Sequence, residues 1–433
     1  MKYFAHQRCF LLLLLFPVCY SDVPSLWPTS TLDKSSVSSR TVSSIFLPLS
    51  GNVYPLGYYS VSVNIGRPPK AYDLDIDTGS DLTWVQCDVS CVGCTKRRDL
   101  LYKPNNNLVH CDDPLCAAIR TPGSQPCKKA TDQCDYEVEY ADQGSSLGVL
   151  VNDFFLLRLT NGSNLISRVA FGCGYNQHHT GPISPPPTAG VLGLGNGKAS
   201  ILSQLSNLGL IQNVLGHCLS SRGGGFLFLG NDLVSPSKVA WTPVLSSSSV
   251  KNYLTGPADV IYNGKPTGVK GLQVIFDSGS SYTYLNSKAY QAILGQVKAD
   301  MTGKPLKEVA EDNSLPICWK GAKPFKSISE IRAHFKPLVL SFTKSKVQLP
   351  LLPDAYLIVS KLGNACLGIL NGAEVNLGEL NVIGDISMQD KVILYDNEQR
   401  QIGWATANCD RLPNVDGDYH GDFSQPFDFG SLS

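Results

Sequence analysis

The stretch "DLDIDTGSDLTWV" at residues 73–85 carries an aspartate, Asp77, to the end of an alternating apolar run. A second stretch, "VIFDSGSSYTYL" at residues 274–285, repeats this arrangement around Asp277. Burying an ionised carboxylate costs free energy unless it is paired or hydrogen-bonded, so a lone aspartate is unexpected at the end of a buried strand. The repeat therefore indicates that Asp77 and Asp277 meet in the folded chain.

A second echo lies downstream of each aspartate. "GVLGLG" at residues 190–195 and "NVIGDI" at residues 381–386 each place two apolar residues before a glycine, Gly193 and Gly384. One Asp–hydroxyl–Gly–Ser string is a weak signal, and a pair of ordinary turn-forming aspartates is the alternative. Two matched pairs in the same order instead predict two half-sized units with related folds.

The residues around the two aspartates suit acid–base chemistry. Two carboxylates in contact cannot both ionise cheaply, so they share one proton. The ionised member can take a proton from water while the protonated member polarises a substrate carbonyl. Thr78 and Ser278 supply hydroxyls, and Gly79 and Gly279 let the backbone pass close by without a side chain in the way.

Length and composition favour a two-lobed, mainly β protein. The 433 residues suit two lobes of ordinary size. Lys plus Arg and Asp plus Glu are 36 each, which removes any whole-chain electrostatic case for nucleic acid or an anionic membrane. With 39 Gly and 27 Pro, many short strands and turns are expected. Helix-like spacing is confined mainly to residues 200–211 and 286–301.

The two ends of the chain suggest a secreted protein. Lys2 and Arg8 precede a short apolar run at residues 10–18, which predicts a signal peptide over residues 1–21. Residues 22–55 are expected to be a leader or short propeptide, and residues 413–433 a flexible tail without the hydrophobic end of a lipid-anchor signal. We therefore expect a soluble protein of the secretory route with no membrane anchor.

The cysteines outside the signal peptide are even in number, which in a secreted chain predicts a disulfide framework. A zinc site at Cys91 and Cys94 is the alternative, but a second CxxC is missing. We expect no metal and no cofactor, and the pair His178–His179 is interpreted as solvated. The sequon at Asn161 predicts a glycosylation site.

From about Tyr58 to Arg411 the chain resembles the pepsin-type aspartic proteases. It is most similar to their plant nucellin-like and nepenthesin-like branch, which carries a cysteine-dense insert after the first motif, here "QCDVSCVGC" onward. The resemblance implies a bilobal fold of two pseudo-symmetric, β-barrel-like lobes with a few short helices, at residues 56–235 and 236–412. It also implies a catalytic pair and four supporting hydroxyl residues: Asp77 and Asp277, with Thr78, Ser80, Ser278 and Ser280.

The family closes a β-hairpin flap over its substrate with a tyrosine. The matching stretch "EYADQGSSLGVL" implies Tyr140 as that tyrosine and Trp84 as its partner. An ordinary strand aromatic and a plain core residue are the alternatives for these two side chains. The stretch departs from the family's Tyr-Gly-x-Gly-Ser, because Ala141 replaces the first glycine and the tip is one residue longer.

The resemblance also implies a disulfide pattern. The expected pairs are Cys87–Cys91, Cys94–Cys173, Cys111–Cys134, Cys116–Cys127, Cys218–Cys409 and Cys318–Cys366.

Two functions from different classes remain. The first is a secreted, monomeric aspartic endopeptidase that cleaves peptide or protein substrates at acid pH, beside bulky apolar residues, in the extracellular space, the cell wall or the vacuole. The second is a non-catalytic binding or inhibitor protein of the plant cell wall on the same fold. Both aspartate motifs are intact, which favours the enzyme.

Overall fold

The computed structural model describes residues 43–120, 127–179, 186–233, 239–245 and 252–411. The predicted signal peptide and tail lie outside the described residues. The described residues all belong to one compact unit that begins at Thr41. Strands make up 42% of the chain and helices 14%, which confirms the mainly β prediction.

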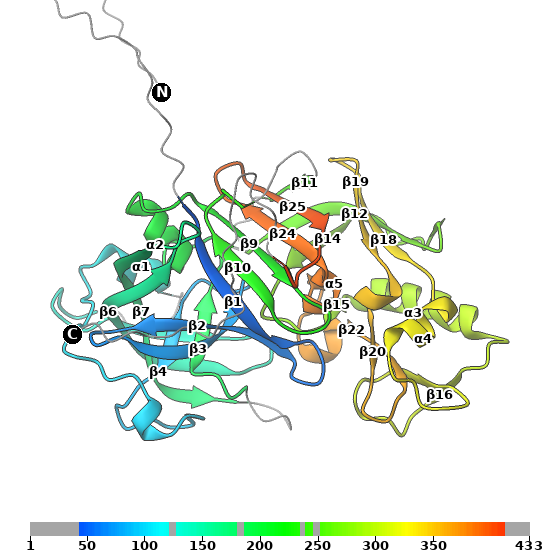
Figure 1. Cartoon of the computed structure of the whole chain (residues 1–433), viewed down its shortest axis with the longest axis horizontal. Coiled ribbons are helices and arrows are strands. Elements are labelled where there is room, and N and C mark those ends of the chain that lie inside the picture. The colour runs from blue at the N-terminus through cyan, green and yellow to red at the C-terminus, as the bar shows by residue number, and fades with distance from the viewer. Residues whose placement is uncertain (1–42, 121–126, 180–185, 234–238, 246–251, 412–433) are drawn as a thin grey trace, which may run out of the picture. The chain divides into compact units, whose positions relative to one another are not determined.

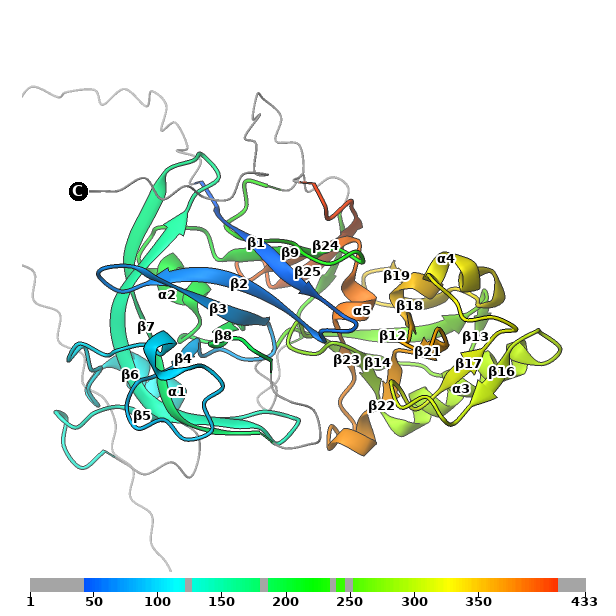
Figure 2. The ribbon, with the colours of Figure 1, turned by 60° about the horizontal axis from the view of Figure 1, so that its bottom comes forward.

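The largest sheet among the described residues has thirteen strands. Two long strands at one end of it, β6 and β7, form an extended antiparallel hairpin (Figures 1 and 2). In spatial order the strands are β11 (Ala240–Pro243), β25 (Gln401–Thr406), β24 (Lys391–Asp396), β9 (Val214–Leu219), β10 (Gly225–Leu229), β1 (Ile45–Asn52), β2 (Tyr58–Ile65), β3 (Lys70–Asp77), β8 (Gly190–Gly193), β4 (Trp84–Gln86), β7 (Asn164–His178), β6 (Ser145–Arg158) and β5 (Asp135–Glu139).

The remaining strands of the described chain form two smaller sheets. The eight-stranded sheet comprises β19 (Val347–Leu351), β18 (Leu338–Phe342), β12 (Leu254–Tyr262), β14 (Leu272–Phe276), β23 (Val382–Ile383), β15 (Thr283–Leu285) and β22 (Ile369–Asn371), with β13 (Lys265–Pro266) paired to β12. The four-stranded sheet comprises β16 (Lys307–Val309), β17 (Cys318–Lys320), β21 (Ala365–Leu367) and β20 (Leu357–Val359).

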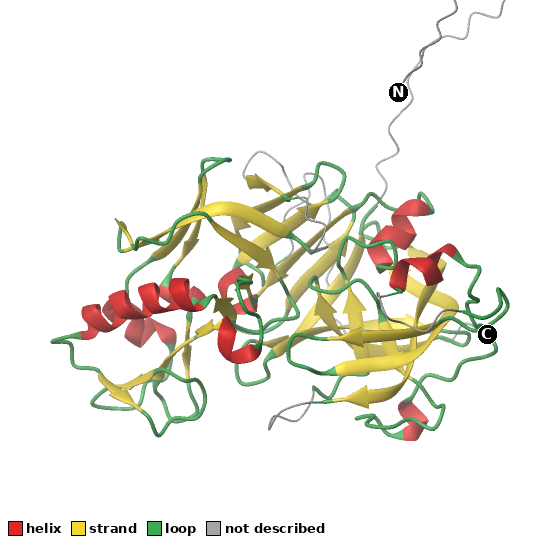
Figure 3. Cartoon of the chain, turned by 180° about the vertical axis from the view of Figure 1, so that it is seen from behind, coloured by secondary structure: helices red, strands yellow, loops and turns green. Residues whose placement is uncertain are grey.

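Helices are few and mostly short (Figure 3). Both helices predicted from the sequence form, and each begins where a polar side chain accepts a backbone N–H, at Ser200 and at Asn286. The described α-helices are α1 (Pro114–Ile119), α2 (Ile201–Asn207), α3 (Ser287–Met301), α4 (Ile328–Ile331) and α5 (Asp385–Met388). Single 3-10 turns cover Arg98–Leu100, Arg332–His334, Pro353–Ala355 and Gly372–Val375.

The sequence echo corresponds to a repeated strand arrangement. Strand β3 ends at Asp77 and pairs in parallel with β8, and β14 ends just before Asp277 and pairs in parallel with β23. The chain then passes close to the end of the parallel partner, where the second echo places Gly193 or Gly384. A Cβ on Gly193 would lie 2.5 Å from the backbone of Asp81, so only glycine fits there.

Strands from both halves of the chain share the largest sheet. Strand β24 pairs with β9, and β25 continues the sheet beyond it (Figure 1). A disulfide between Cys218 on β9 and Cys409, just after β25, covalently links the same region. Residues on both sides of the predicted division at residue 235 therefore contribute strands to one sheet.

The described fold begins within the residues predicted as a leader. Residues 45–52 form β1, which pairs with β10 on one side and β2 on the other. A strand hydrogen-bonded on both edges is part of the described fold, so the last residues of the predicted leader, 45–52, belong to the largest sheet. Pro48 interrupts the apolar alternation of "IFLPLSGN", which explains why the strand was missed.

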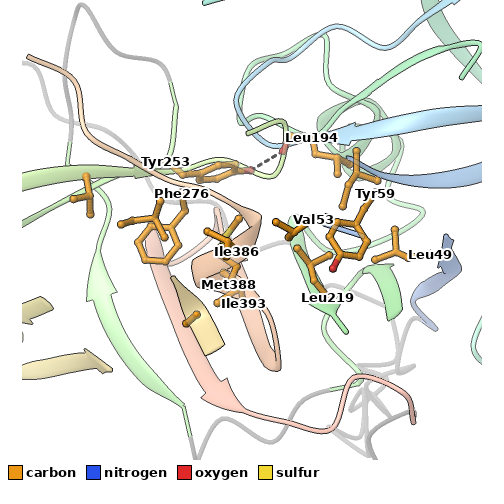
Figure 4. Close-up of a cluster of buried hydrophobic side chains, with 14 of the residues drawn as sticks. Leu49, Val53, Tyr59, Leu194, Leu219, Tyr253, Phe276, Ile386, Met388 and Ile393 are labelled. Atoms are coloured by element: carbon orange, nitrogen blue, oxygen red, sulfur yellow. Dashed lines mark hydrogen bonds between the residues drawn. The ribbon is translucent and has the colours of Figure 1, made fainter. Parts of the chain in front are cut away.

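The core continues directly beneath both aspartate loops. Phe276 precedes Asp277, Leu194 follows Gly193, and Ile386 follows Gly384 by two positions; all three are buried (Figure 4). Tyr253 donates a hydrogen bond from its hydroxyl to the carbonyl of Leu194 at 3.0 Å, which ties the two halves together. The aspartate loops therefore rest on a packed apolar base that limits their motion.

We predict that removing the disulfide between β9 and the C-terminal end of the sheet is costly. Because Cys218 and Cys409 are separated by 191 residues, the Cys218→Ala, Cys409→Ala variant should lose about 4 kcal/mol of unfolding free energy. The matched control removes Cys91–Cys94, which spans only 3 residues and should cost less than about 2 kcal/mol. Urea denaturation measures both, and equal losses would contradict the prediction.

Candidate active site

The two aspartates occupy equivalent positions at the ends of β3 and β14. Asp77 is buried, with 7% of its surface exposed, and Asp277 is half-buried. Each of the two lies where its strand passes into a loop, Asp77 as the last residue of β3 and Asp277 as the first residue after β14. The structure thus brings together the two residues that the sequence predicted to meet.

Each carboxylate accepts hydrogen bonds from its own loop. The amide of Gly79 donates to Asp77 Oδ1 at 2.8 Å, and the hydroxyl of Ser80 donates to Asp77 Oδ2. The second loop repeats the pattern, with the amide of Gly279 at 2.9 Å from Asp277 Oδ1 and the hydroxyl of Ser280 at 2.9 Å from Asp277 Oδ2. These donors compensate for lost hydration and fix the orientation of both carboxyl groups.

Thr78 and Ser278 lock the two loops to each other. The amide of Thr78 donates to Ser278 Oγ at 3.1 Å, and the amide of Ser278 donates to Thr78 Oγ1 at 2.9 Å. Each hydroxyl in turn donates to a carbonyl of the opposite strand, Thr78 to Phe276 at 3.1 Å and Ser278 to Ile76 at 3.2 Å. Four buried hydrogen bonds therefore hold the two aspartate loops in a fixed register.

Glycine at the third position of each motif allows the carboxylates to approach each other. A Cβ on Gly79 would lie 2.6 Å from Asp277 Oδ1, and a Cβ on Gly279 would lie 2.5 Å from Asp77 Oδ1. Both separations are shorter than van der Waals contact, so any side chain here would push one carboxylate away. Each carboxylate thus lies against the loop that carries the other.

The surroundings raise the pKa of Asp77. Burial is the main cause, and the nearby charge of Asp277 adds to it, while the hydrogen bonds from Ser80 and Gly79 act in the opposite direction. The pair consequently retains one proton at a pH where an isolated aspartate would be ionised. This is the protonation state required for one carboxyl to act as base and the other as acid.

The predicted flap tyrosine and its partner are in contact. Tyr140 lies at the tip of the hairpin formed by β5 and β6, and the indole N–H of Trp84 donates to its hydroxyl at 2.6 Å. The negative charge of Asp77 is close enough to contribute to a raised pKa of Tyr140, after the larger effect of burial. At the altered tip, Gln143 adopts the left-handed conformation with φ 68°.

The cysteine pairing differs from the prediction in the insert. The structure joins Cys218 to Cys409 and Cys318 to Cys366 as expected, but the other four predicted pairs are wrong. The observed pairs are Cys87–Cys173, Cys91–Cys94, Cys111–Cys127 and Cys116–Cys134. The reason is strand register: residue 85, two before Cys87, pairs with Cys173 in the parallel β4–β7 ladder, which draws these two cysteines together.

No free metal ligand set emerges from the cysteines of the described chain. Two clusters contain three close metal-ligating residues, Cys111, Cys116 and Cys127, and Asp312, Cys318 and Cys366. All of these cysteines are in disulfides, as are Cys91 and Cys94 of the zinc alternative. A disulfide sulfur is not available as a thiolate ligand.

The predicted surface residues lie as follows. His178 and His179 are both exposed. Asn161 is exposed in the turn between β6 and β7, where its Oδ1 accepts the amide of Ser163 at 3.0 Å.

Two further aspartates near the pair were missed. Asp75 is half-buried, and its Oδ2 accepts the hydroxyl of Thr188 at 3.0 Å. Asp385, directly after Gly384, is buried, and its Oδ1 has no hydrogen-bond partner. The spacing places Asp75 on the face of Asp77, because residues two apart on a strand share a face, but it does so equally for the exposed Asp73.

Asp385 carries the clearest electrostatic penalty near the pair. Burial raises the pKa of Asp385 well above its ordinary value, and the charges of Asp277 and Asp77 raise it further. In the folded protein this carboxyl is therefore neutral through the acid range and adds no third negative charge.

Comparisons with known proteins agree with this geometry. Two family models match, described as Xylanase inhibitor N-terminal over residues 59–231 and Xylanase inhibitor C-terminal over residues 260–406. A protein of Oryza sativa subsp. japonica named as an aspartic proteinase is 44% identical over 383 residues, covering 86% of this chain and 92% of that protein.

Solved structures show the same fold at low sequence identity. The basic 7S globulin from soybean superposes with a TM-score of 0.65 at 16% identity, covering 86% of this chain and 99% of the other. The aspartic proteinase from Irpex lacteus superposes with a TM-score of 0.59 at 17% identity, covering 84% and 98%.

We predict that the Thr78 hydroxyl, more than its shape, stabilises the site. Thr78→Val preserves volume but removes the buried hydrogen bonds to the amide of Ser278 and the carbonyl of Phe276, so the free energy of unfolding should fall by about 2–4 kcal/mol. Thr78→Ser keeps the hydroxyl and is the control. Urea denaturation of both variants tests this, and equal losses would show that packing alone is responsible.

We also predict a pH-dependent effect of Asp385. The folded carboxyl keeps its proton while the unfolded one releases it above its ordinary pKa, so this group makes unfolding easier as pH rises from about 4 toward neutral. In Asp385→Asn the free energy of unfolding should therefore fall less steeply as pH rises, by up to about 1.4 kcal/mol per pH unit.

The control for this slope is Asp73→Asn, an exposed aspartate on β3. Denaturation series at several pH values provide the slopes. An Asp385→Asn slope equal to that of the unmodified protein would mean that the buried carboxyl is already ionised.

Proposed function

Since the chain belongs to the pepsin-like aspartic proteases and is an aspartic endopeptidase, we propose that Asp77 and Asp277 are its catalytic pair and that it works at acid pH. The single observation that carries the proposal is the reciprocal packing of the two carboxylates, each against the glycine of the opposite loop. Peptides or proteins are its substrates.

The mechanism follows from one proton shared between two carboxyl groups. The ionised carboxylate takes a proton from a water molecule, whose oxygen attacks the carbonyl carbon of the scissile peptide bond. The protonated carboxyl donates to the carbonyl oxygen and stabilises the tetrahedral intermediate as the C–O double bond opens. Transfer of a proton to the amide nitrogen then breaks the C–N bond, and no covalent enzyme intermediate forms.

Each surrounding group has a definite task in this scheme. The amides of Gly79 and Gly279 and the hydroxyls of Ser80 and Ser280 orient the two carboxylates for the shared proton. Tyr140, held by Trp84, closes over the substrate and excludes bulk water from the reacting bond.

A second candidate is a binding protein without catalysis. The matching family models are described as xylanase inhibitor domains, which favours this candidate. The hydrogen bonds around both carboxylates argue against this candidate. A protein that only binds has no need to orient two carboxylates toward each other. Active-site titration with a statine-type transition-state analogue distinguishes the two, since a pure binder takes up no stoichiometric analogue.

The compartment in which the protein acts is also part of the proposal. No helix among the described residues is long and apolar enough to cross a membrane. The apolar N-terminal segment and the disulfides support entry into the secretory route and residence in the cell wall or vacuole. The exposed turn at Asn161 supports glycosylation there, and we propose that the protein acts as a monomer.

We predict that Asp77→Asn and Asp277→Asn each lower kcat/KM by at least about 10³-fold, because each variant loses one acid–base partner. Because the pKa of Asp77 is raised, the pair should keep its shared proton in acid, and activity should decline as pH rises past that pKa. Cleavage of a fluorogenic peptide library across pH measures both effects.

The matched control is Asp73→Asn, which makes the same chemical change at an exposed site on the same strand. Its activity should stay within about twofold of the unmodified protein. Cleavage that survives Asp77→Asn would end the case for a shared-proton mechanism.

A further inference from the structure

Asp75 lies beside the catalytic pair but has no task in the mechanism. It precedes Asp77 by two positions on β3, and alternate residues of a strand point to the same face. The opposite face of this strand, with Tyr72, Leu74 and Ile76, is buried in the core. Asp75 therefore points to the side on which Asp77 meets the substrate, about 7 Å further along the strand.

Its neighbours across the sheet connect it to the flap. Asp75 pairs with Val191 of β8, and Val191 pairs with Trp84 of β4, so these three side chains form one row on the same face. Tyr140 and Val191 both pack in the hydrophobic cluster that contains Trp84. The carboxyl group thus lies in the floor beneath the flap tyrosine, next to an aromatic and aliphatic wall.

The carboxyl group of Asp75 is only partly satisfied. Oδ2 accepts the hydroxyl of Thr188, while Oδ1 is buried and without a hydrogen-bond partner. Within the described part of the chain, Asp75 forms no ion pair; Lys96 is near enough to lower its pKa but does not reach ion-pair distance. The ionised form of this half-buried carboxyl is disfavoured unless a ligand supplies a cation.

We propose that Asp75 is a specificity residue that selects a lysine or arginine side chain of the substrate at a position adjoining the scissile bond. The inference rests on the proposed catalytic pair, because Asp77 defines where that bond lies. A side chain adjoining a bond held at the pair can reach about 7 Å along β3, since extended peptide advances about 3.3 Å per residue. Its methylene stem would pack on Val191 and Trp84 while its charged end meets Asp75.

This assignment changes the expected substrate preference. The sequence predicted bulky apolar residues around the cleaved bond, which fits the Trp84 wall but not a carboxylate in the floor. A long basic side chain satisfies both, because it combines an apolar stem with a terminal cation.

The preference should depend on pH. Burial raises the pKa of Asp75 to about 7, against the hydrogen bond from Thr188 and the charge of Lys96. The other titratable groups near it are Tyr58 on β2, Asp385 on α5, and Asp73 and Asp77 on its own strand. Selection for a cation should therefore strengthen as pH rises from about 4 toward 6, where a growing fraction of the carboxyl is ionised.

The test uses pairs of peptide substrates that differ only by lysine or its uncharged isostere norleucine, at the positions on either side of the cleaved bond. We expect the unmodified protein to favour lysine about tenfold in kcat/KM at one of these positions near pH 6. Asp75→Asn should abolish this ratio while still cleaving the norleucine peptide. Asp73→Asn, two residues away on the same face, is the matched control and should keep the ratio.

A second variant keeps the proposal testable if Asp75→Asn does not fold. Asp75→Glu retains the charge on a longer side chain, so it should shift the preference from lysine to the shorter ornithine. Unchanged discrimination in both folded variants, or no lysine preference in the unmodified protein, overturns the inference while the proposed function stands. Absence of Asp77-dependent cleavage of every peptide overturns the proposed function and the inference together.

Discussion

The reciprocal hydrogen bonds between Thr78 and Ser278 are the interaction on which the site depends. They join residues from opposite halves of the chain in a place where neither hydroxyl is accessible to water. A displacement of either loop would leave two amides and two carbonyls buried and unpaired, at a cost of about 1–3 kcal/mol each. Small relative movements of the halves are therefore resisted at the point where two acids must remain in register.

This rigidity explains why so much acidic character is tolerated in one region. Asp277, Asp77 and Asp75 all raise the pKa of Asp385, and Asp277 also raises the pKa of Asp77, so the four carboxyl groups are electrostatically linked. A flexible site would relieve the repulsion by opening, whereas a locked one must keep some of the carboxyls neutral. Because the backbone is fixed, the crowded carboxyl groups keep protons that isolated carboxyl groups would release. Acid–base hydrolysis requires such a retained proton.

The sequence was sufficient to predict the features that occur in both halves of the chain or that depend on local residues. Asp77 and Asp277 could be paired because each motif has its own copy of the downstream glycine, and Ser200 and Asn286 marked helix starts through capping, which is local. The sequence could not predict the features that depend on strand register. The cysteine pairs of the insert follow from the β4–β7 ladder, and β1 was missed because its partners, β2 and β10, include a strand far along the chain. Asp75 could not be distinguished from the exposed Asp73, because alternation assigns a face but does not say whether that face is covered.

The sharing of strands across the two halves has a consequence for biosynthesis. Strand β9 meets its neighbour β24 only after residues 391–396 have been translated, so the edge of β9 has no partner while most of the polypeptide is being made. An open edge of this kind pairs readily with other chains. The largest sheet therefore cannot be completed until the last strands have left the ribosome, and until then the nascent chain carries an open strand edge.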